Sequence, residues 1–119
     1  MNVRSNKCNA TKAMCSSGHK HDSKKEARRC DELNLMQRAG LIKGLNIQPK
    51  YELIPAKKDS TGKTIERQLN YIADFSYTTS DGQFVVEDVK KRKKGAVYNL
   101  FVVKRKLMLH IHGIRVIEV

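Results

Sequence analysis

The stretch from Tyr71 to Lys90 constrains the fold most, because it reads as a β-hairpin with acidic residues inside its strands. Residues 71–77 and 84–89 are rich in aromatic and β-branched side chains, which favour strands. The segment 78–82 between them, TTSDG, is typical of a turn. A carboxylate in a strand fit for burial is costly unless a partner neutralises it. A bound divalent cation is one such partner.

The turn predicts which side chains of the hairpin face each other. Ser80-Asp81-Gly82 suits a three-residue loop, a type I turn followed by a left-handed glycine. This loop places Asp74 opposite Asp88, on the face that also carries Lys90, while Glu87 points to the other face. A slip of one residue would instead pair Asp74 with Glu87, so Glu87 remains an alternative. The full register pairs Thr79 with Gln83, Ser76 with Val86, Asp74 with Asp88, and Ile72 with Lys90.

The net charge points to a polyanionic partner. The chain has 119 residues, enough for one small domain. It carries 24 Lys and Arg against 12 Asp and Glu, a formal charge of +12. A charge balance this basic favours nucleic acid as the partner. An anionic membrane surface is less expected, because the sequence has no basic amphipathic helix with a bulky apolar face at a terminus. The plain alternative is a basic protein without such a partner.

The chain lacks the sequence signals of membrane insertion and export. No apolar run approaches the roughly 20 residues that span a bilayer. The N-terminal stretch MNVRSNKCNATK has no apolar core of the kind found in signal peptides. The 3 cysteines, an odd number, fit a reducing compartment. A cytoplasmic location is therefore expected.

The N-terminal half predicts a short basic segment and then a helix. Residues 1–21 are polar and basic, with a turn at residues 15–18 between two short extended pieces. A helix begins at Ser23, because Ser23 and Glu26 match a capping box. Gly40 is the expected end of this helix.

The remaining elements complete an α/β pattern. Residues 41–56 read as a strand with a bend or edge position at Pro49, and residues 57–67 read as a polar loop. After the hairpin, residues 96–109 have helical spacing. Residues 114–119 then form a buried strand, parallel to the hairpin because the connection is long enough for a crossover helix. The predicted order is helix, three strands, helix, strand.

That order, with acids at these places, resembles the core of the PD-(D/E)XK nuclease superfamily. Ala73-Asp74-Phe75 matches the "PD" element with alanine in place of proline, and Asp88-Val89-Lys90 matches the D-x-K element. Glu26 falls where several members carry a glutamate on the first helix. The resemblance implies a restriction-endonuclease-like αβββαβ core, with a mixed central sheet flanked by helices, over residues 22–119.

A narrower likeness is to small phage and prophage proteins regarded as endonucleases of Holliday-junction-resolvase type. The strings DSKKEARR, IQPKYELIP, YIADF and VEDVK carry it. The family usually reads D-V-K-G at its second element, where this chain has Lys91 instead of glycine. Neither this departure nor the missing proline falls on a catalytic position of the family.

The resemblance implies a metal-dependent phosphodiesterase site. It assigns the metal to the carboxylates of Asp74 and Asp88, the carbonyl of Val89 and, for a second metal or a metal-bound water, Glu26. Mg²⁺ is the expected ion and Mn²⁺ a substitute, because Mg²⁺ binds through one or two carboxylates and keeps several waters. Lys90 would orient the attacking water, stabilise hydroxide or bind the scissile phosphate.

Each of these residues also has a structural explanation. Asp74 and Asp88 could pair with Lys90 in a salt bridge, although two acids against one lysine leave a negative charge over. The capping box accounts for Glu26 locally. Zinc is not expected, because the nearby cysteines and histidines lack the usual paired spacing. Those residues are Cys8, Cys15, His19 and His21.

Basic residues that could contact phosphates fall into three groups, on the first helix, after the hairpin and on the second helix. The run after Lys90 is the best candidate, since it begins beside the predicted site. No base-reading motif or aromatic stacking platform is evident, which favours recognition of DNA shape or branching. The predicted contacts are Lys24, Arg28, Arg29, Lys91, Arg92, Lys93, Lys94, Lys104 and Lys106.

The sequence therefore predicts a Mg²⁺-dependent DNA endonuclease that cuts branched DNA in phage recombination or packaging, in the cytoplasm of the host cell. Symmetric cutting of two strands implies a homodimer. The main alternative is a non-catalytic DNA- or RNA-binding protein on a degenerate nuclease fold. An RNA-directed nuclease is a third possibility.

Overall fold

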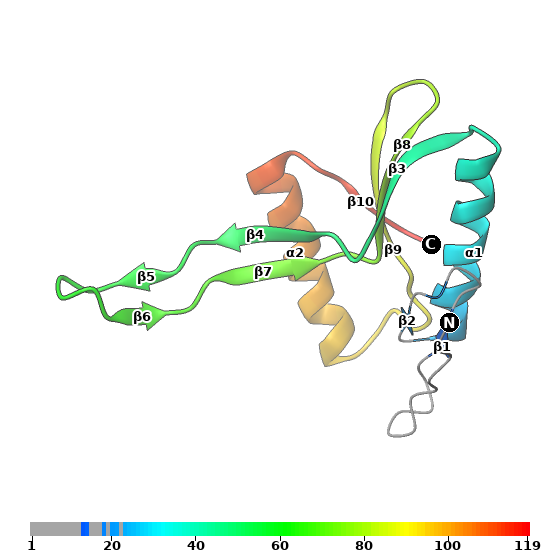
Figure 1. The fold of residues 1–119 in the computed structure, drawn as a ribbon. Coiled ribbons are helices and arrows are strands. Elements are labelled where there is room, and N and C mark those ends of the chain that lie inside the picture. Colours follow the sequence, from blue (N-terminus) through cyan, green and yellow to red (C-terminus); the bar gives the residue numbers. More distant parts are fainter. Residues whose placement is uncertain (1–12, 15–17, 19, 22) are drawn as a thin grey trace.

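The computed structural model describes residues 13–14, 18, 20–21 and 23–119. A central β-sheet lies between two helices, α1 (Lys24–Arg38) and α2 (Ala96–His112), and a long β-ribbon extends from it (Figure 1). The protein is thus a mixed α/β structure, as the pattern of helices and strands predicts. None of the described helices is long and apolar enough to cross a membrane.

The N-terminal segment contributes a small hairpin beside α1. Strands β1 (Ala13–Met14) and β2 (Lys20–His21) pair antiparallel, which agrees with the two short extended pieces expected there. Both strands lie next to α1. Cys8, Cys15 and His19, considered above as zinc ligands, lie outside the described residues.

Helix α1 begins and ends at the predicted signals. The hydroxyl of Ser23 accepts a hydrogen bond from the Glu26 N–H at 3.1 Å, the first half of the capping box. At the other end Gly40 has φ +80°, a left-handed conformation that glycine adopts without strain. The helix buries Ala27, Cys30 and Leu33 against the sheet.

Four strands form the central sheet in the order β10, β9, β8, β3. They are β3 (Ile42–Ile47), β8 (Phe75–Thr79), β9 (Phe84–Asp88) and β10 (Val116–Glu118). The pairs β3–β8 and β8–β9 are antiparallel, whereas β10 runs parallel to β9. The prediction of a final parallel strand reached through a crossover helix is confirmed. That strand is not fully buried as predicted, because β10 lies at the edge of the sheet and Ile117 is exposed.

The β8–β9 hairpin has the predicted register. Ser76 pairs with Val86, and the Thr79 N–H donates to the carbonyl of Gln83 at 2.8 Å. Gly82 closes the turn with φ +90°. The slipped register is wrong, because Glu87 pairs with Phe75 and not with Asp74.

The prediction that Ile72 faces Lys90 is wrong. Ile72 belongs to a different pair of strands, where it pairs with Lys50 and is exposed. The chain breaks its strand between Ile72 and Phe75, so the ladder with β9 ends before it reaches Ile72.

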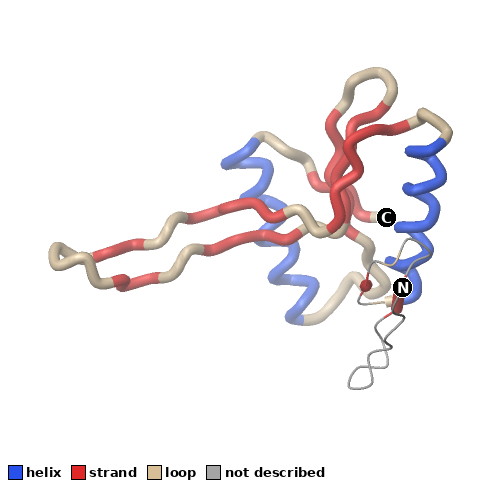
Figure 2. Tube along the Cα trace, viewed as in Figure 1, coloured by secondary structure: helices blue, strands red, loops and turns tan. Residues whose placement is uncertain are grey.

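Beyond Pro49 the chain forms a two-stranded ribbon, which we call the arm. Strand β4 (Lys50–Ile54) pairs with β7 (Leu69–Ile72), and β5 (Lys57–Lys58) pairs with β6 (Thr64–Glu66) nearer the tip. Figure 2 shows these strands as two long antiparallel runs leading away from the sheet. The interpretation of residues 57–67 as a loop is therefore wrong except at the turn itself. The polar composition of these residues favoured a loop, although backbone hydrogen bonds pair them as a ribbon.

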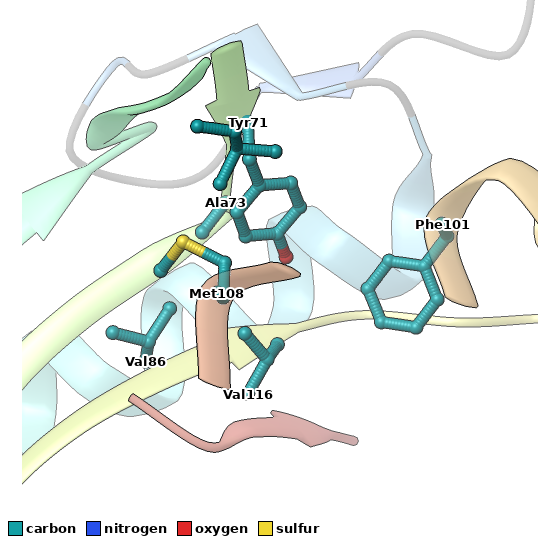
Figure 3. Packing of buried hydrophobic residues seen from close by; sticks show 7 residues of the cluster. Tyr71, Ala73, Val86, Phe101, Met108 and Val116 are labelled. Atoms are coloured by element: carbon teal, nitrogen blue, oxygen red, sulfur yellow. The ribbon is translucent and has the colours of Figure 1, made fainter. Parts of the chain in front are cut away.

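The apolar core has two parts, one on each face of the sheet. Helix α1 packs with Ile42, Phe75 and Tyr77 on one face. Helix α2 packs on the other face, through residues that include Phe101 and Met108. Figure 3 shows Tyr71 of β7 lying among the α2 side chains, so the base of the arm is part of this second core.

Candidate metal and phosphodiesterase site

Asp74 and Asp88 lie at the edge where the hairpin ends. Asp88 is the last residue of β9, and Asp74 occupies the break between β7 and β8. The Asp74 N–H donates to the carbonyl of Glu87 at 3.2 Å, and the Asp74 carbonyl accepts from Gln48 N–H at 2.9 Å. The backbone therefore fixes Asp74 from both neighbouring strands, across from Asp88. Gln48 thus holds this position through its backbone.

The carboxyl of Asp74 is held in a protonated form. Burial, and then the negative charge of Asp88, raise its pKa to about 9. A hydrogen bond between the carboxyl groups of Asp74 and Asp88 also raises the pKa of Asp74. The Val89 N–H donates to Asp74 Oδ2 at 2.7 Å, and this hydrogen bond lowers the pKa. Two buried carboxyl groups that share a hydrogen bond favour one proton between them.

Asp88 has two further partners. The Lys90 Nζ lies 3.2 Å from Asp88 Oδ1, so the predicted convergence of Asp74, Asp88 and Lys90 is what the structure shows. The Tyr71 hydroxyl donates a hydrogen bond to Asp88 Oδ2. Burial, and then the charge of Asp88, raise the pKa of Tyr71, so the phenol remains a donor.

The sequence did not reveal Tyr71 as part of the site. Tyr71 precedes the break at Asp74, and a strand register stops being informative at a break. Its position three residues before the acid gives no signal of its own. Only the packing of the ring against α2, with a centroid distance of 6.3 Å to Phe101, brings the hydroxyl to Asp88.

Lys90 is held at both its side chain and its backbone. Its Nζ lies 3.9 Å from the centre of the Phe101 ring, a cation–π contact. Its N–H donates to the Val119 carbonyl at 3.1 Å, and its carbonyl accepts from Lys25 Nζ at 2.7 Å. Lys25, a second residue that sequence reasoning missed, thus ties the start of α1 to the end of the hairpin.

Glu26 lies at the start of α1 with its side chain turned inward. It is 5% exposed, and its negative charge contributes to the raised pKa of Asp74. The structure therefore brings Glu26 to the same site as the two aspartates, in addition to its position in the helix cap.

Glu87 occupies the opposite face of β9 and has its own partners. Arg29 donates to both of its oxygens, Nε to Oε1 at 2.9 Å and Nη2 to Oε2 at 2.6 Å, and the Tyr77 hydroxyl donates as well. The hydrogen bond to Glu87 raises the pKa of Arg29, and burial raises that of Tyr77 to about 12. Glu87 is thus neutralised internally, which argues against it as a metal ligand.

Arg29 was expected to contact nucleic acid, and in this structure its guanidinium is used by Glu87 and by Glu32 at 3.0 Å. Lys24 and Arg28, its neighbours on α1, are exposed. A hollow of about 340 Å³ beside Val89 is lined by Lys25, Arg28 and Arg29. Two of the three predicted contacts on this helix are therefore open to solvent.

The basic run after the hairpin lies next to Lys90. Lys91, Arg92 and Lys94 join Lys90 in lining an open hollow of about 560 Å³ at the start of α2. Lys93 instead approaches Glu118 at 3.7 Å, where Arg105 also pairs at 2.8 Å. On α2, Lys106 is exposed and Lys104 is half-buried.

The donor set can be tested against a divalent cation. Among the described residues, no three His, Cys, Asp or Glu side chains are arranged as a ready cluster for a metal. Asp74 and Asp88 nevertheless share a hydrogen bond and a buried negative charge that a proton now offsets. Oxygen donors of this kind suit Mg²⁺, which needs only one or two carboxylates. Glu26 and the Val89 carbonyl, assigned by resemblance, would add to this pair.

Fold and site together define a small mixed α/β protein with a carboxylate pair and a lysine at the end of a central strand. The chain belongs to a family of proteins of unknown function, DUF1064, whose family model matches residues 5–115. Neither the curated proteins nor the solved structures contain a match to the chain.

Proposed function

We propose that the protein is a Mg²⁺-dependent endonuclease of the PD-(D/E)XK type, with a restriction-endonuclease-like core. The observation that carries this proposal is the convergence of Asp74, Asp88 and Lys90 beside a basic hollow. A structural salt bridge would need one acid for one base, whereas here a second carboxyl is buried against the first. Buried acids beside a run of exposed lysines and arginines fit a phosphate substrate.

The residues of the chain would divide the chemistry of hydrolysis among them. Mg²⁺, when bound, acts as a Lewis acid and lowers the pKa of water. Asp74 and Asp88 would hold it after Asp74 releases its proton, with Glu26 and the carbonyl of Val89 close by. Lys90 would orient the attacking water or hold the scissile phosphate.

The exposed lysines and arginines would hold the nucleic acid backbone without reading bases. Lys91, Arg92 and Lys94 lie beside Lys90, and Lys24 and Arg28 lie on α1. Such contacts are independent of sequence and sensitive to salt. We propose branched DNA, such as a four-way junction, as the substrate, in the cytoplasm of a phage-infected or lysogenic cell.

A resolvase cuts two strands symmetrically, and each chain carries one site, so we propose a homodimer. Several large apolar side chains on α2 are exposed, which supports a second copy as a partner. They are Val97, Leu100, Val103, Leu109 and Ile111.

The test is a cleavage assay on three substrates, a four-way junction, a linear duplex and a single strand, each with Mg²⁺ or with EDTA. We expect Mg²⁺-dependent cleavage of the junction, and its loss in an Asp88→Ala variant. Binding without cleavage in either Mg²⁺ or Mn²⁺ would leave the non-catalytic binding protein as the better account. Equal cleavage of the linear duplex and the junction would remove the junction preference and keep the nuclease.

A further inference from the structure

The arm has no role in the site described above, except at its base. Figure 1 shows it extending beyond α2, away from the rest of the molecule. Every residue from 54 to 68 is exposed. An uncovered two-stranded ribbon is only marginally stable in water, so its persistence calls for an explanation.

Specific contacts order both ends of the arm. At the tip, Asp59 Oδ1 accepts hydrogen bonds from the N–H groups of Thr61 and Lys63, at 2.9 and 3.0 Å. At the base, Leu53 and Tyr71 are buried against α2, and His112 Nε2 lies 2.6 Å from the Glu52 carbonyl. The arm is therefore a formed element whose outer half is exposed to solvent.

The chemistry of the outer half is basic. Lys57, Lys58, Lys63 and Arg67, which we call the basic tip, are all exposed. None of the four forms an ion pair with another of the described residues. Of the two acids nearby, Asp59 is engaged in the turn and Glu66 stands opposite Lys57. The remaining positive charge faces solvent and is complementary to phosphate.

The length of the arm matches a repeat of duplex DNA. Strands rise about 3.3 Å per residue, so Lys57, and Lys63 opposite Asp59, lie about 26–33 Å along the arm from Pro49, and their long side chains reach further. One helical turn of duplex DNA measures about 34–36 Å. A duplex that has a phosphate at Asp74 and Asp88 and that runs along the arm would bring the same strand back to the basic tip one turn away.

We infer that the arm is a second nucleic-acid contact, which holds the phosphate backbone of a duplex about one helical turn from the Asp74–Asp88 pair. The inference deepens the proposed function, on which it rests for the nature of the partner. It assigns the protein a minimum duplex length, below which the basic tip has nothing to bind.

Binding of fluorescent duplexes to the full-length protein in EDTA, where no cleavage is expected, tests the inference. The variant reverses three charges of the basic tip, Lys58→Glu, Lys63→Glu and Arg67→Glu, and leaves Lys57 because it faces Glu66. The control variant reverses three exposed charges that have no assigned role, Arg38→Glu, Lys43→Glu and Arg115→Glu. The duplexes are hairpins of about 8 and about 24 base pairs, chosen to be shorter and longer than one helical turn.

On the long duplex, we expect the tip variant to lower the slope of log K against log salt by about two to three, since each lost phosphate contact removes about 0.9. On the short duplex, the tip variant and the control variant should weaken binding equally. An equal effect of both variants on the long duplex, or no effect of either, overturns the inference. Unchanged duplex binding with a changed oligomeric state in light scattering overturns it too, and assigns the arm to contact between copies.

The two proposals fail separately. If the wild type never cleaves but the tip variant loses binding to the long duplex alone, the nuclease is wrong and the arm contact stands. If the wild type cleaves and the tip variant binds and cleaves all lengths equally well, only the arm contact is wrong. Circular dichroism of each variant confirms that the fold is intact.

Discussion

Strand β9 carries two adjacent carboxylates whose surroundings on the two faces of the sheet are opposite in kind. Glu87 meets a bidentate arginine and a phenol, and it is 2% exposed. Asp88 meets a second carboxyl, a phenol and a lysine that also rests on an aromatic ring. One face is balanced in charge, whereas the other carries an acid that only a proton neutralises.

This difference shows how two adjacent residues of one strand can have a structural role on one face and a chemical role on the other. Successive residues of a strand point to opposite faces, so Glu87 and Asp88 contact different groups although they are adjacent in sequence. The α1 face uses its acid to anchor the helix to the sheet. On the α2 face, Asp74 and Asp88 are buried close together, and a bound cation would stabilise their charged forms. This is the property expected of a metal site.

The largest expected effect separates the two carboxylates by activity. Asp88→Asn should lower the rate of junction cleavage about 10³-fold, as loss of a group that stabilises developing charge does. Glu87→Gln should leave the rate per folded molecule unchanged within about threefold, because its side chain faces α1. Single-turnover cleavage, normalised to the folded fraction, measures both. Equal losses in the two variants would contradict the division of β9 into two faces.

The next effect separates the faces by stability. Arg29→Ala should lower the free energy of unfolding by about 3 kcal/mol, because it leaves the buried Glu87 charge without its partner. Lys90→Ala should cost less, because Asp88 can share a proton with Asp74 instead. Urea denaturation at neutral pH gives both values. A larger loss for Lys90→Ala would mean that the α2 face is the structural one.

A smaller effect concerns pH and the proton of Asp74. Between its ordinary pKa of 3.8 and its raised value of about 9, the folded chain holds a proton that the unfolded chain has lost. Stability from this group therefore decreases as the pH rises through that window. Asp74→Asn removes the titrating carboxyl group. It should therefore raise the melting temperature at pH 8 by about 4 °C, a gain of roughly 1 kcal/mol in the free energy of unfolding.

The measurement is thermal unfolding of the metal-free wild type and the variant from pH 4 to pH 9. Subtracting one profile from the other cancels every other titrating group. A difference that does not change with pH would show that Asp74 is ionised in the folded chain.

The smallest expected signal is the proton that leaves when Mg²⁺ binds. Because Asp74 is protonated at pH 7, metal binding should release about one proton per site. Calorimetric titrations in two buffers with different ionisation enthalpies measure this number. It should approach zero above pH 9 and in Asp74→Asn. Release of one proton in that variant would place the titrating group elsewhere.

The register of the site could be predicted because one turn fixed it. Ser80-Asp81-Gly82 has a single well-populated geometry, and that geometry places Asp74 opposite Asp88 without knowledge of the rest of the fold. The crossover to a parallel final strand followed from the length of the connection. Both predictions depended on local chemistry that tertiary packing did not alter.

The parts that could not be predicted depend on contacts between distant elements. Tyr71 reaches Asp88 across a break in its strand, and Lys25 reaches the Lys90 carbonyl from another helix. The pairing of Arg29 with Glu87 joins residues 58 positions apart. A count of charges identified Arg29 as a candidate phosphate ligand, but only the packing of α1 on the sheet shows that its guanidinium is already used.

The arm was missed for a different reason. Its outer strands contain few apolar residues and no clear alternation, so residues 57–67 looked like a loop. Yet the turn at Asp59 to Lys63 repeats the geometry of the turn at Thr79 to Gln83, with a glycine at φ +90° in each. Recognition of the same three-residue loop twice would have predicted both ribbons.

The arm has one more consequence, which concerns self-association. Among the described strands, β5 and β6 pair only with each other, so each exposes a row of unpaired backbone groups to which a strand of another molecule could add. Lysines along such edges discourage this addition, and the basic tip places charged side chains there. Substitutions that merely neutralise the tip would expose a ribbon ready to aggregate, whereas charge reversal keeps molecules apart. The positive charge of the basic tip thus disfavours edge-to-edge pairing of these strands between molecules, independently of the proposed contact with nucleic acid.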